Sequence, residues 1–339
     1  MRIRIWALRL ICVWLLWGLS TALTWAAVPK VLYKSFFPIS ESQWIIQGKM
    51  IYLEDDDAKE ELKDRAFGNF FSHRCKQFPL TIALGSDTWR TKTDDGGNFR
   101  LEAVATYAIT ASGTREFVFT SDTRSGWKET FSHDGTASAA FLIISDVDDT
   151  VLVTEVTNRF KMLMKTFFTD PDRRGVVAGT PQVYQSLVHG TEPDKQGLLV
   201  FVSASPMYLA PRLEAFFLHQ KFPPFTLILR EFGVKEKWED KAEDLSDYKF
   251  TKISDLLNRT ASMPVILLGD SGERDPEIYA RIVDAFPGRA RCVIIRNITE
   301  QDEFHQRYLE LKKKVKLIVW RDPQKLLAGL ITEGLVRAP

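Results

Sequence analysis

The sequence predicts an α/β protein in which a parallel sheet with flanking helices follows a small all-β sandwich. Residues 141–339 alternate short apolar strands with amphipathic helical segments, which is the pattern of a parallel sheet. Residues 43–138 contain short alternating runs separated by turn residues, which is typical of a β-sandwich. The chain has 339 residues, and this length favours two domains over one.

Composition and charge are those of an ordinary globular protein, with 45% hydrophobic and 26% charged residues. The formal net charge is +1, so nothing indicates bulk electrostatic binding to nucleic acid, and no such partner is expected. Outside the N-terminal segment the cysteines are Cys75 and Cys292. We expect two buried free thiols, with a disulfide as the alternative in an oxidising compartment.

Residues 1–27 are predicted to be a signal peptide. Three arginines within the first nine residues precede an apolar run over 10–19, and small residues follow. Cleavage after Ala26 or Ala27 would export the protein to the periplasm or the cell exterior. The apolar run is also long enough for an uncleaved membrane anchor, and this alternative stays open.

The expected sandwich occupies residues 43–138, after a linker at 28–42 that contains two prolines. No catalytic constellation is evident in it, so it is expected either to pack against the C-terminal domain or to bind a partner. Its strands are expected over 43–54, 79–87, 98–109 and 115–122, with turns at 94–97 and 112–114.

The stretch 141–154 places acidic residues directly after a buried strand. Four apolar residues are followed by Asp146, Asp148 and Asp149. Carboxylates this dense at the end of a buried strand are costly unless a cation binds there, and Mg²⁺ suits hard oxygen ligands of this kind. For this short motif alone, an acidic turn is the alternative.

Later segments favour a functional site. One apolar strand ends at Ser203, another ends at Asp270 with Asp275 five residues on, and Lys249 lies near the start of a predicted helix. In an open parallel sheet, ligands bind at the carboxyl ends of the strands. We therefore expect Asp146, Ser203 and Asp270 to meet at one edge of the sheet.

The order Asp-x-Asp, Ser, Lys, Gly-Asp-x4-Asp resembles the motif set of the haloacid dehalogenase superfamily of phosphoryl-transfer enzymes. Over about residues 141–300 the chain is similar to the phosphatidate phosphatase catalytic-domain family within it. Tyr248 departs from that pattern, because a His is expected before the motif Lys. The stretches that carry the resemblance are ISDVDDT, VFVSASPMYLAPRL, FPPFTLILR, YKFTKI and LLGDSGERDPEIYARI.

The resemblance implies that residues 139–339 form a haloacid-dehalogenase-like phosphatase domain with a Rossmannoid sheet. It implies hydrolysis of phosphatidate or a related lipid phosphomonoester through an aspartyl-phosphate. Asp146 is then the nucleophile and Asp148 the proton donor and acceptor, while Ser203 and Lys249 hold the phosphoryl oxygens. The implied substrate meets the enzyme at a membrane surface.

Mg²⁺ is implied to bind Asp146, the backbone carbonyl of Asp148, and Asp270. Asp275 is expected at the metal site, where it orients Lys249 or a metal-bound water, and Thr150 supports the loop near the substrate.

Some nearby residues have alternative interpretations. Arg230 ends a strand on the same edge and is a candidate for substrate contact or for a surface salt bridge. Ser205 is expected to cap a helix that begins at Pro206, and Lys252 is the alternative to Lys249 as the phosphate lysine.

The superfamily inserts a cap between its first two motifs, here residues 155–197. The insert is short, so an open site able to receive a lipid headgroup is expected. Residues 160–168 carry an apolar stripe with interleaved lysines, which suits either packing on the sheet or contact with lipid. Two other functions remain alternatives: a phosphatase of soluble or protein phosphomonoesters, and a non-catalytic binding module.

Overall fold

The computed structural model describes most of the chain, and all structural statements below refer to that part. Residues 1–26 of the expected signal peptide and the stripe at 160–168 lie outside it. No helix within the described ranges is long and apolar enough to cross a membrane. The described residues are 27–54, 61–62, 72–106, 114–134, 139–148, 150–151, 178–193, 195–231, 242–260, 263–299, 302 and 305–338.

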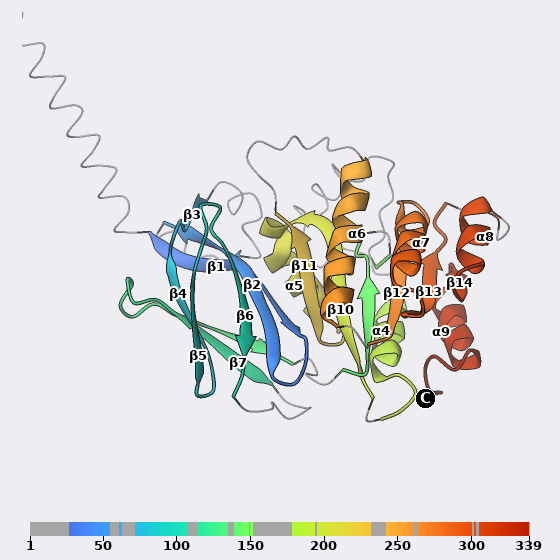
Figure 1. Ribbon diagram of the computed structural model, residues 1–339, viewed down its shortest axis with the longest axis horizontal. Helices are drawn as coiled ribbons and strands as arrows, with labels where there is room; N and C mark the ends of the chain where they lie inside the picture. The colour runs from blue at the N-terminus through green and yellow to red at the C-terminus, as the bar shows by residue number, and fades with distance from the viewer. Residues whose placement is uncertain are drawn as a thin grey trace, which may run out of the picture.

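The C-terminal part is built on a six-stranded parallel sheet in the order β11-β10-β9-β12-β13-β14 (Figure 1). Strand order runs outward from β9 in both directions, so it reverses between β9 and β12. The predicted α/β architecture with a parallel sheet is thereby confirmed. The strands are β9 (Phe141–Ser145), β10 (Gly197–Pro206), β11 (Phe225–Arg230), β12 (Val265–Asp270), β13 (Ala290–Arg296) and β14 (Leu317–Trp320).

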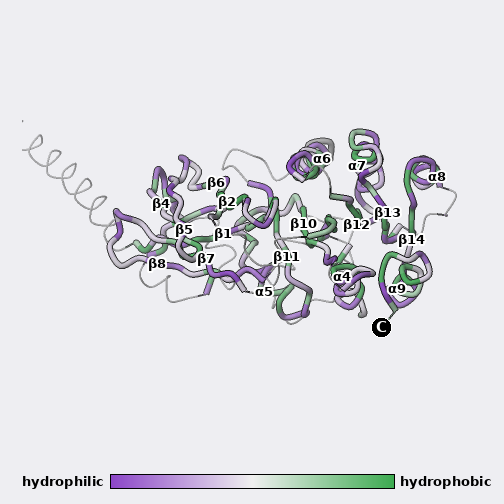
Figure 2. Tube along the Cα trace, turned by 60° about the horizontal axis from the view of Figure 1, so that its bottom comes forward, coloured by the Kyte–Doolittle hydropathy of each residue, from purple (hydrophilic) through white to green (hydrophobic). Residues whose placement is uncertain are grey.

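Helices cover both faces of this sheet, three on each face in the described part (Figure 2). Because both faces are covered, the central strands are apolar at nearly every position: all five residues of β9 and all six of β12 are buried. One face carries α4 (Thr180–His189), α5 (Ala210–His219) and α9 (Pro323–Thr332). The other carries α6 (Ala242–Arg259), α7 (Asp275–Ala285) and α8 (Gln306–Lys312).

The N-terminal part contains two four-stranded antiparallel sheets. One hydrophobic cluster joins them, with Trp44 of the first sheet packed edge-on against Phe117 of the second at 5.6 Å between ring centroids. The first sheet comprises β1 (Val28–Pro38), β2 (Gln43–Leu53), β3 (His73–Arg74) and β6 (Asn98–Val104). The second comprises β4 (Pro79–Leu84), β5 (Asp87–Lys92), β7 (Arg115–Thr120) and β8 (Lys128–His133).

The expected linker at 28–42 is wrong for most of its length, because Val28–Pro38 form β1 and pair with β2 along the whole strand. Its two prolines are tolerated because β1 is an edge strand and both lie near its ends. Side chains of β1 enter different cores: Phe36 joins the cluster between the antiparallel sheets, whereas Tyr33 and Phe37 join the clusters of the parallel sheet.

Hydrogen bonds fasten β1 to the parallel-sheet part. The Tyr33 hydroxyl donates to the Leu227 carbonyl at 2.8 Å, and Thr226 Oγ1 donates to the Phe36 carbonyl at 2.7 Å. The first antiparallel sheet therefore packs directly against the C-terminal part through β1.

The chain after Ser203 also differs from expectation. Strand β10 continues to Pro206, a 3₁₀ turn spans Met207–Leu209, and α5 starts at Ala210, so Ser205 does not cap a helix. Proline fits only the first turn of a helix, and Pro211 occupies that turn of α5. This requirement sets the start of the helix and leaves the Ser205 side chain available to the site.

Two smaller expectations are also settled. Part of the expected cap insert, residues 180–189, forms α4, which packs into the core of the sheet. Cys75 and Cys292 are free and buried, as predicted, and burial raises the pKa of each thiol to about 12.

Candidate active site

The carboxyl ends of β9 and β12 meet at the point where the strand order reverses. Asp146 directly follows β9, and Asp270 is the last residue of β12. The Asp146 amide donates to the Leu268 carbonyl at 2.9 Å, which fixes the two strand ends side by side. Ligands bind at such a reversal in open α/β sheets, so the predicted meeting of these two aspartates falls where the fold favours a site.

Lys249 reaches this edge from the middle of α6, about two turns after the helix begins, and not from near its start. Its ammonium lies 2.7 Å from Asp146 Oδ1, 2.9 Å from Asp275 Oδ1 and 2.9 Å from Glu273 Oε2. Its N–H groups donate to Glu273 and Asp275, and the contact with Asp146 is an ion pair. Burial alone would lower the pKa of Lys249, but the carboxylates outweigh it and raise that pKa well above its usual value.

Asp275, the first residue of α7, uses both carboxylate oxygens within the protein. Oδ1 accepts from Lys249, and Oδ2 accepts from the Asp270 amide at 3.1 Å. A Cβ atom at Gly269 would collide with this carboxylate, so the glycine before Asp270 makes room for it. Asp275 therefore ties Lys249 to the end of β12.

The carboxylates fit a divalent cation. Asp146, Asp270 and Asp275 each offer an oxygen within 4.8 Å of the others. Asp146 Oδ2 is buried and accepts no hydrogen bond from the described residues. Burial raises the pKa of Asp146 against the effect of Lys249, and burial followed by the Asp275 charge raises that of Asp270. A hard cation such as Mg²⁺ would offset these charges.

Asp148 is held by two serines of β10. Ser203 Oγ and Ser205 Oγ each donate to Asp148 Oδ2 at 3.2 Å, and the Ser205 amide donates to Ser203 Oγ at 2.9 Å. The predicted residue Ser203 is therefore at the site, and Ser205 joins it because β10 extends to Pro206. Thr150 is buried beside them, and its amide donates to the Asp148 carbonyl at 2.6 Å.

Of the alternatives, Lys249 and not Lys252 lies in the carboxylate cluster. Lys252 Nζ instead lies 5.7 Å from the centroid of the Tyr248 ring. Arg230 ends β11, two strands from Asp146, in register with Pro206. Tyr248, in the place of the expected His, has a buried hydroxyl with no hydrogen-bond partner among the described residues.

Sequence reasoning missed several residues that support the site. Glu273 is the third carboxylate on Lys249. Ser145 donates to the Asp146 carbonyl at 2.7 Å, so its hydroxyl proton is used and Tyr184 is the donor of their 2.6 Å contact. Glu273 and Tyr184 lie 24 and 39 positions from their partners, and no local pattern marks them.

Arg307 of α8 binds the loop after β12 through hydrogen bonds and an ion pair. Its guanidinium donates to the carbonyls of Ser271 and Glu273 at 2.6 and 2.5 Å, and it pairs with Glu277 at 2.7 Å. This loop presents Asp270, whose Oδ1 accepts from the amides of the two residues after Ser271. The orientation of the loop therefore depends on α8.

Comparison with known proteins first indicates the class of protein to which the chain is similar. Residues 141–297 match a family of phosphatases, which points to a hydrolase of phosphoric monoesters. The family is the phosphatidate phosphatase APP1 catalytic domain, so the resemblance seen in the motifs is confirmed for this segment.

Two curated relatives each align with about half of the chain. An uncharacterized protein of Schizosaccharomyces pombe is 29% identical over 158 residues, 46% of this chain and 25% of its own. Phosphatidate phosphatase APP1 of Saccharomyces cerevisiae is 27% identical over 168 residues, 50% of this chain and 28% of its own. The chain thus spans about a quarter of the length of these relatives.

Among solved structures, a carbohydrate acetylesterase from Xanthomonas citri aligns over 78% of this chain and 68% of its own. Its sequence identity is 9% and its TM-score is 0.31, a similarity too low to support an argument.

Proposed function

We propose that this protein is a Mg²⁺-dependent phosphatase of phosphatidate or a related lipid phosphomonoester that works through an aspartyl-phosphate. Its catalytic domain is then haloacid-dehalogenase-like and follows a β-sandwich in the sequence. One observation carries the proposal. Within the segment that matches the family, Asp146 is buried at the strand-order reversal, with one oxygen on Lys249 and the other without a donor among the described residues. A carboxylate held in this way suits a nucleophile.

In the first step, an Asp146 oxygen attacks phosphorus and the bond from phosphorus to the ester oxygen breaks. The leaving alkoxide takes a proton from the Asp148 carboxyl, which the two serine hydroxyls hold in place. Asp146 then carries the phosphoryl group. A positioned proton donor of this kind contributes roughly 10²–10⁴-fold to the rate.

In the second step, Asp148, now a carboxylate, accepts a proton from water while the water oxygen attacks phosphorus. The bond between phosphorus and Asp146 breaks, which releases phosphate and restores both carboxyl groups. Lys249 remains charged throughout, because its carboxylate partners hold its pKa high, and it offsets negative charge on the transferring group.

Mg²⁺ would be held by Asp146 and Asp270, with the Asp148 carbonyl completing the protein ligands, and it would supply charge neutralisation at the phosphoryl oxygens. Asp275 is less suited to ligation, because both of its oxygens already accept hydrogen bonds within the protein. Its role is to position Lys249 and the end of β12.

Phosphatidate is proposed as the substrate because one relative is a phosphatidate phosphatase. The substrate would then be met at a membrane surface, and residues 1–27 would export the protein or anchor it. Mass spectrometry of the native protein tests export: a mature start at Ala27 or Val28 supports cleavage, and an intact N-terminus supports the anchor.

The deciding experiment measures phosphate release from three substrates: phosphatidate in phosphatidylcholine vesicles, p-nitrophenyl phosphate and a phosphopeptide. Each is assayed with Mg²⁺ and with excess chelator, and Asp146→Asn serves as the inactive control. The proposal predicts Mg²⁺-dependent turnover with the highest kcat/KM on phosphatidate. Preference for a soluble substrate would shift the proposal to the second candidate, and no turnover of any substrate would favour a binding module.

A further inference from the structure

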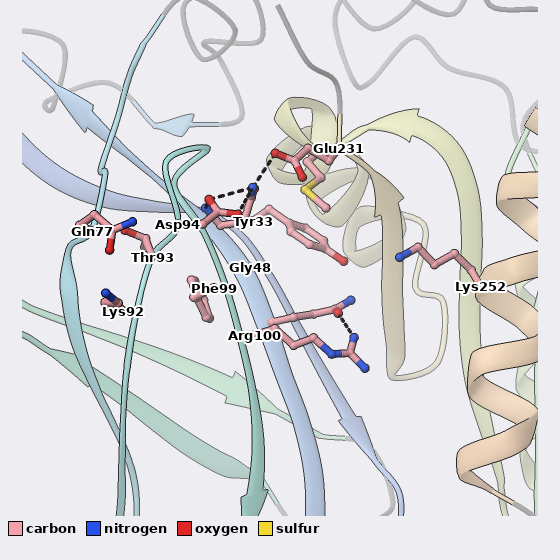
Figure 3. A pocket seen from close by; sticks show the side chains of 13 residues that line it. Tyr33, Gly48, Gln77, Lys92, Thr93, Asp94, Phe99, Arg100, Glu231 and Lys252 are labelled. Atoms are coloured by element: carbon pink, nitrogen blue, oxygen red, sulfur yellow. Dashed lines mark hydrogen bonds between the residues drawn. The ribbon is translucent and has the colours of Figure 1, made fainter. Parts of the chain in front are cut away.

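A cleft of about 440 Å³ lies between the first antiparallel sheet and the parallel-sheet part (Figure 3). Gln47 of β2 and Arg100 of β6 line one wall. Met207, Glu231 and Lys252 line the other. The volume falls in the range of small-molecule sites.

The second wall connects the cleft to the active site. Lys252 is three residues after Lys249 on α6, a spacing that places their Cβ atoms roughly 5–6 Å apart. Met207 follows the end of β10, and Glu231 follows the end of β11, so both lie at the carboxyl edge of the sheet. The cleft and Asp146 therefore lie at the same edge of the sheet.

The acidic side chains of the cleft are already engaged. Asp94 Oδ1 accepts from the amides of Gly96 and Asn98, each at 2.8 Å. Glu231 accepts from the Asn98 side chain and lies 3.6 Å from the ammonium of Lys49. Both carboxylates therefore already have partners within the protein.

The basic side chains are less committed. Within the described part of the chain, Lys252 has no carboxylate partner, and Figure 3 shows its ammonium directed into the cleft. Arg100, on the opposite wall, donates to Gln47 at 2.7 Å and reaches Asp255 only at 3.4 Å. Two cations from different parts of the fold thus face the same space.

We propose that this cleft binds a second anionic oxygen group, a phosphate or carboxylate, carried by the substrate beyond the phosphoryl group that is removed. The inference rests on the proposed function for the position of that first phosphoryl group. The antiparallel part then contributes to substrate selection through Arg100, and the catalytic part contributes Lys252. Arginine and lysine both bind such groups through charge-assisted hydrogen bonds.

The test uses matched pairs of soluble probes: 1,3-propanediol and 1,6-hexanediol, each as monophosphate and bisphosphate. Binding is measured by calorimetry with Mg²⁺ in the Asp146→Asn background, where turnover is removed. At least one bisphosphate should bind about tenfold more tightly than its monophosphate. Adding Lys252→Met or Arg100→Gln should remove most of that difference, whereas Lys325→Met, on the exposed surface of α9, should keep it.

Turnover of the same probes by the wild-type protein separates the two proposals. A binding preference without any turnover would overturn the phosphatase function and support the cleft. The proposed anion site in the cleft would be overturned by turnover in which the monophosphate and bisphosphate of each diol bind equally well. It would also be overturned by a preference for the bisphosphate that survives both substitutions. If free inorganic phosphate tightens monophosphate binding as much as the attached second phosphate does, the anion is a separate molecule and the same-substrate assignment is wrong.

Discussion

The two parts of the molecule differ in the surroundings of their buried ionisable side chains. In the parallel-sheet part, Lys249 and Asp146 are both buried and charged groups surround them. In the antiparallel part, Arg115 and His133 are buried as a cross-strand pair of β7 and β8. Burial, reinforced by the Arg115 charge, lowers the pKa of His133 to about 4, so this histidine is neutral at pH 7.

The difference follows from how each sheet meets its neighbours. At the carboxyl edge of the parallel sheet, Lys249 of α6 meets Asp146, which follows β9, and Asp275 of α7. Opposite charges from three elements therefore lie together. The antiparallel sheets instead share a cluster rich in aromatic rings, and the His133 and Trp44 ring centroids are 5.5 Å apart. The Lys249–Asp146 pair is therefore found where several elements supply charged groups, which is also where chemistry is expected, whereas His133 beside Arg115 is neutral.

The largest expected effect comes from removing the charge at the centre of the cluster. Asp146→Asn should lower phosphate release by roughly 10³-fold or more, because the amide is a poor nucleophile. The fold should persist, since Lys249 keeps Asp275 and Glu273 as partners. Phosphate-release kinetics measure the activity and thermal unfolding measures the stability, with exposed Asp284→Asn as the control. Residual activity of more than a few per cent would refute the assignment of Asp146 as the nucleophile.

His133 tests the opposite behaviour of the antiparallel part. The unfolded chain binds a proton on this residue near pH 6.5 and the folded chain only near pH 4, so stability should fall as pH decreases between these values. Compared with His133→Phe, the wild-type protein should lose about 2–3 kcal/mol more on going from pH 7 to pH 4.5. Denaturant unfolding at both values measures the difference, and His73→Gln, at an exposed site, should behave like the wild type.

Gly269→Ala tests whether the cluster depends on close packing. The added Cβ would collide with the Asp275 carboxylate, so we expect destabilisation of about 1–3 kcal/mol and lower activity through displaced Lys249. Gly329→Ala is the matched control, because nothing lies within 4 Å of its added Cβ and alanine favours α9. An unchanged melting temperature for the first variant would contradict the packing argument.

The smallest expected effect concerns the strand between the two parts. Tyr33→Phe removes the hydrogen bond to the Leu227 carbonyl and should cost about 1 kcal/mol of unfolding free energy. Thr226→Val removes the bond to the Phe36 carbonyl from the other side and should cost a similar amount. If neither change alters chemical unfolding, the packing of side chains alone holds β1 in place.

Much of the parallel-sheet part could be predicted from the sequence because its signals are local. A parallel strand that is covered on both faces is apolar throughout, so β9 and β12 stand out as continuous runs. The residues that end such strands lie at one edge by geometry, which was enough to bring Asp146 and Asp270 together. The motifs also indicated the family whose model matches residues 141–297.

Only the tertiary structure decided the rest, because it depends on partners that are distant in the sequence. The role of β1 is set by contacts with residues about 190 positions away, and nothing within 28–42 shows which side chains enter which core. Likewise, Ser205 contacts Asp148 because α5 begins only at Ala210, with Pro211 in its first turn. The cleft forms where Arg100 of β6 and Lys252 of α6 face each other. Local sequence specifies the buried strands of the parallel sheet and what they carry at their ends, whereas long-range packing specifies which of those groups meet.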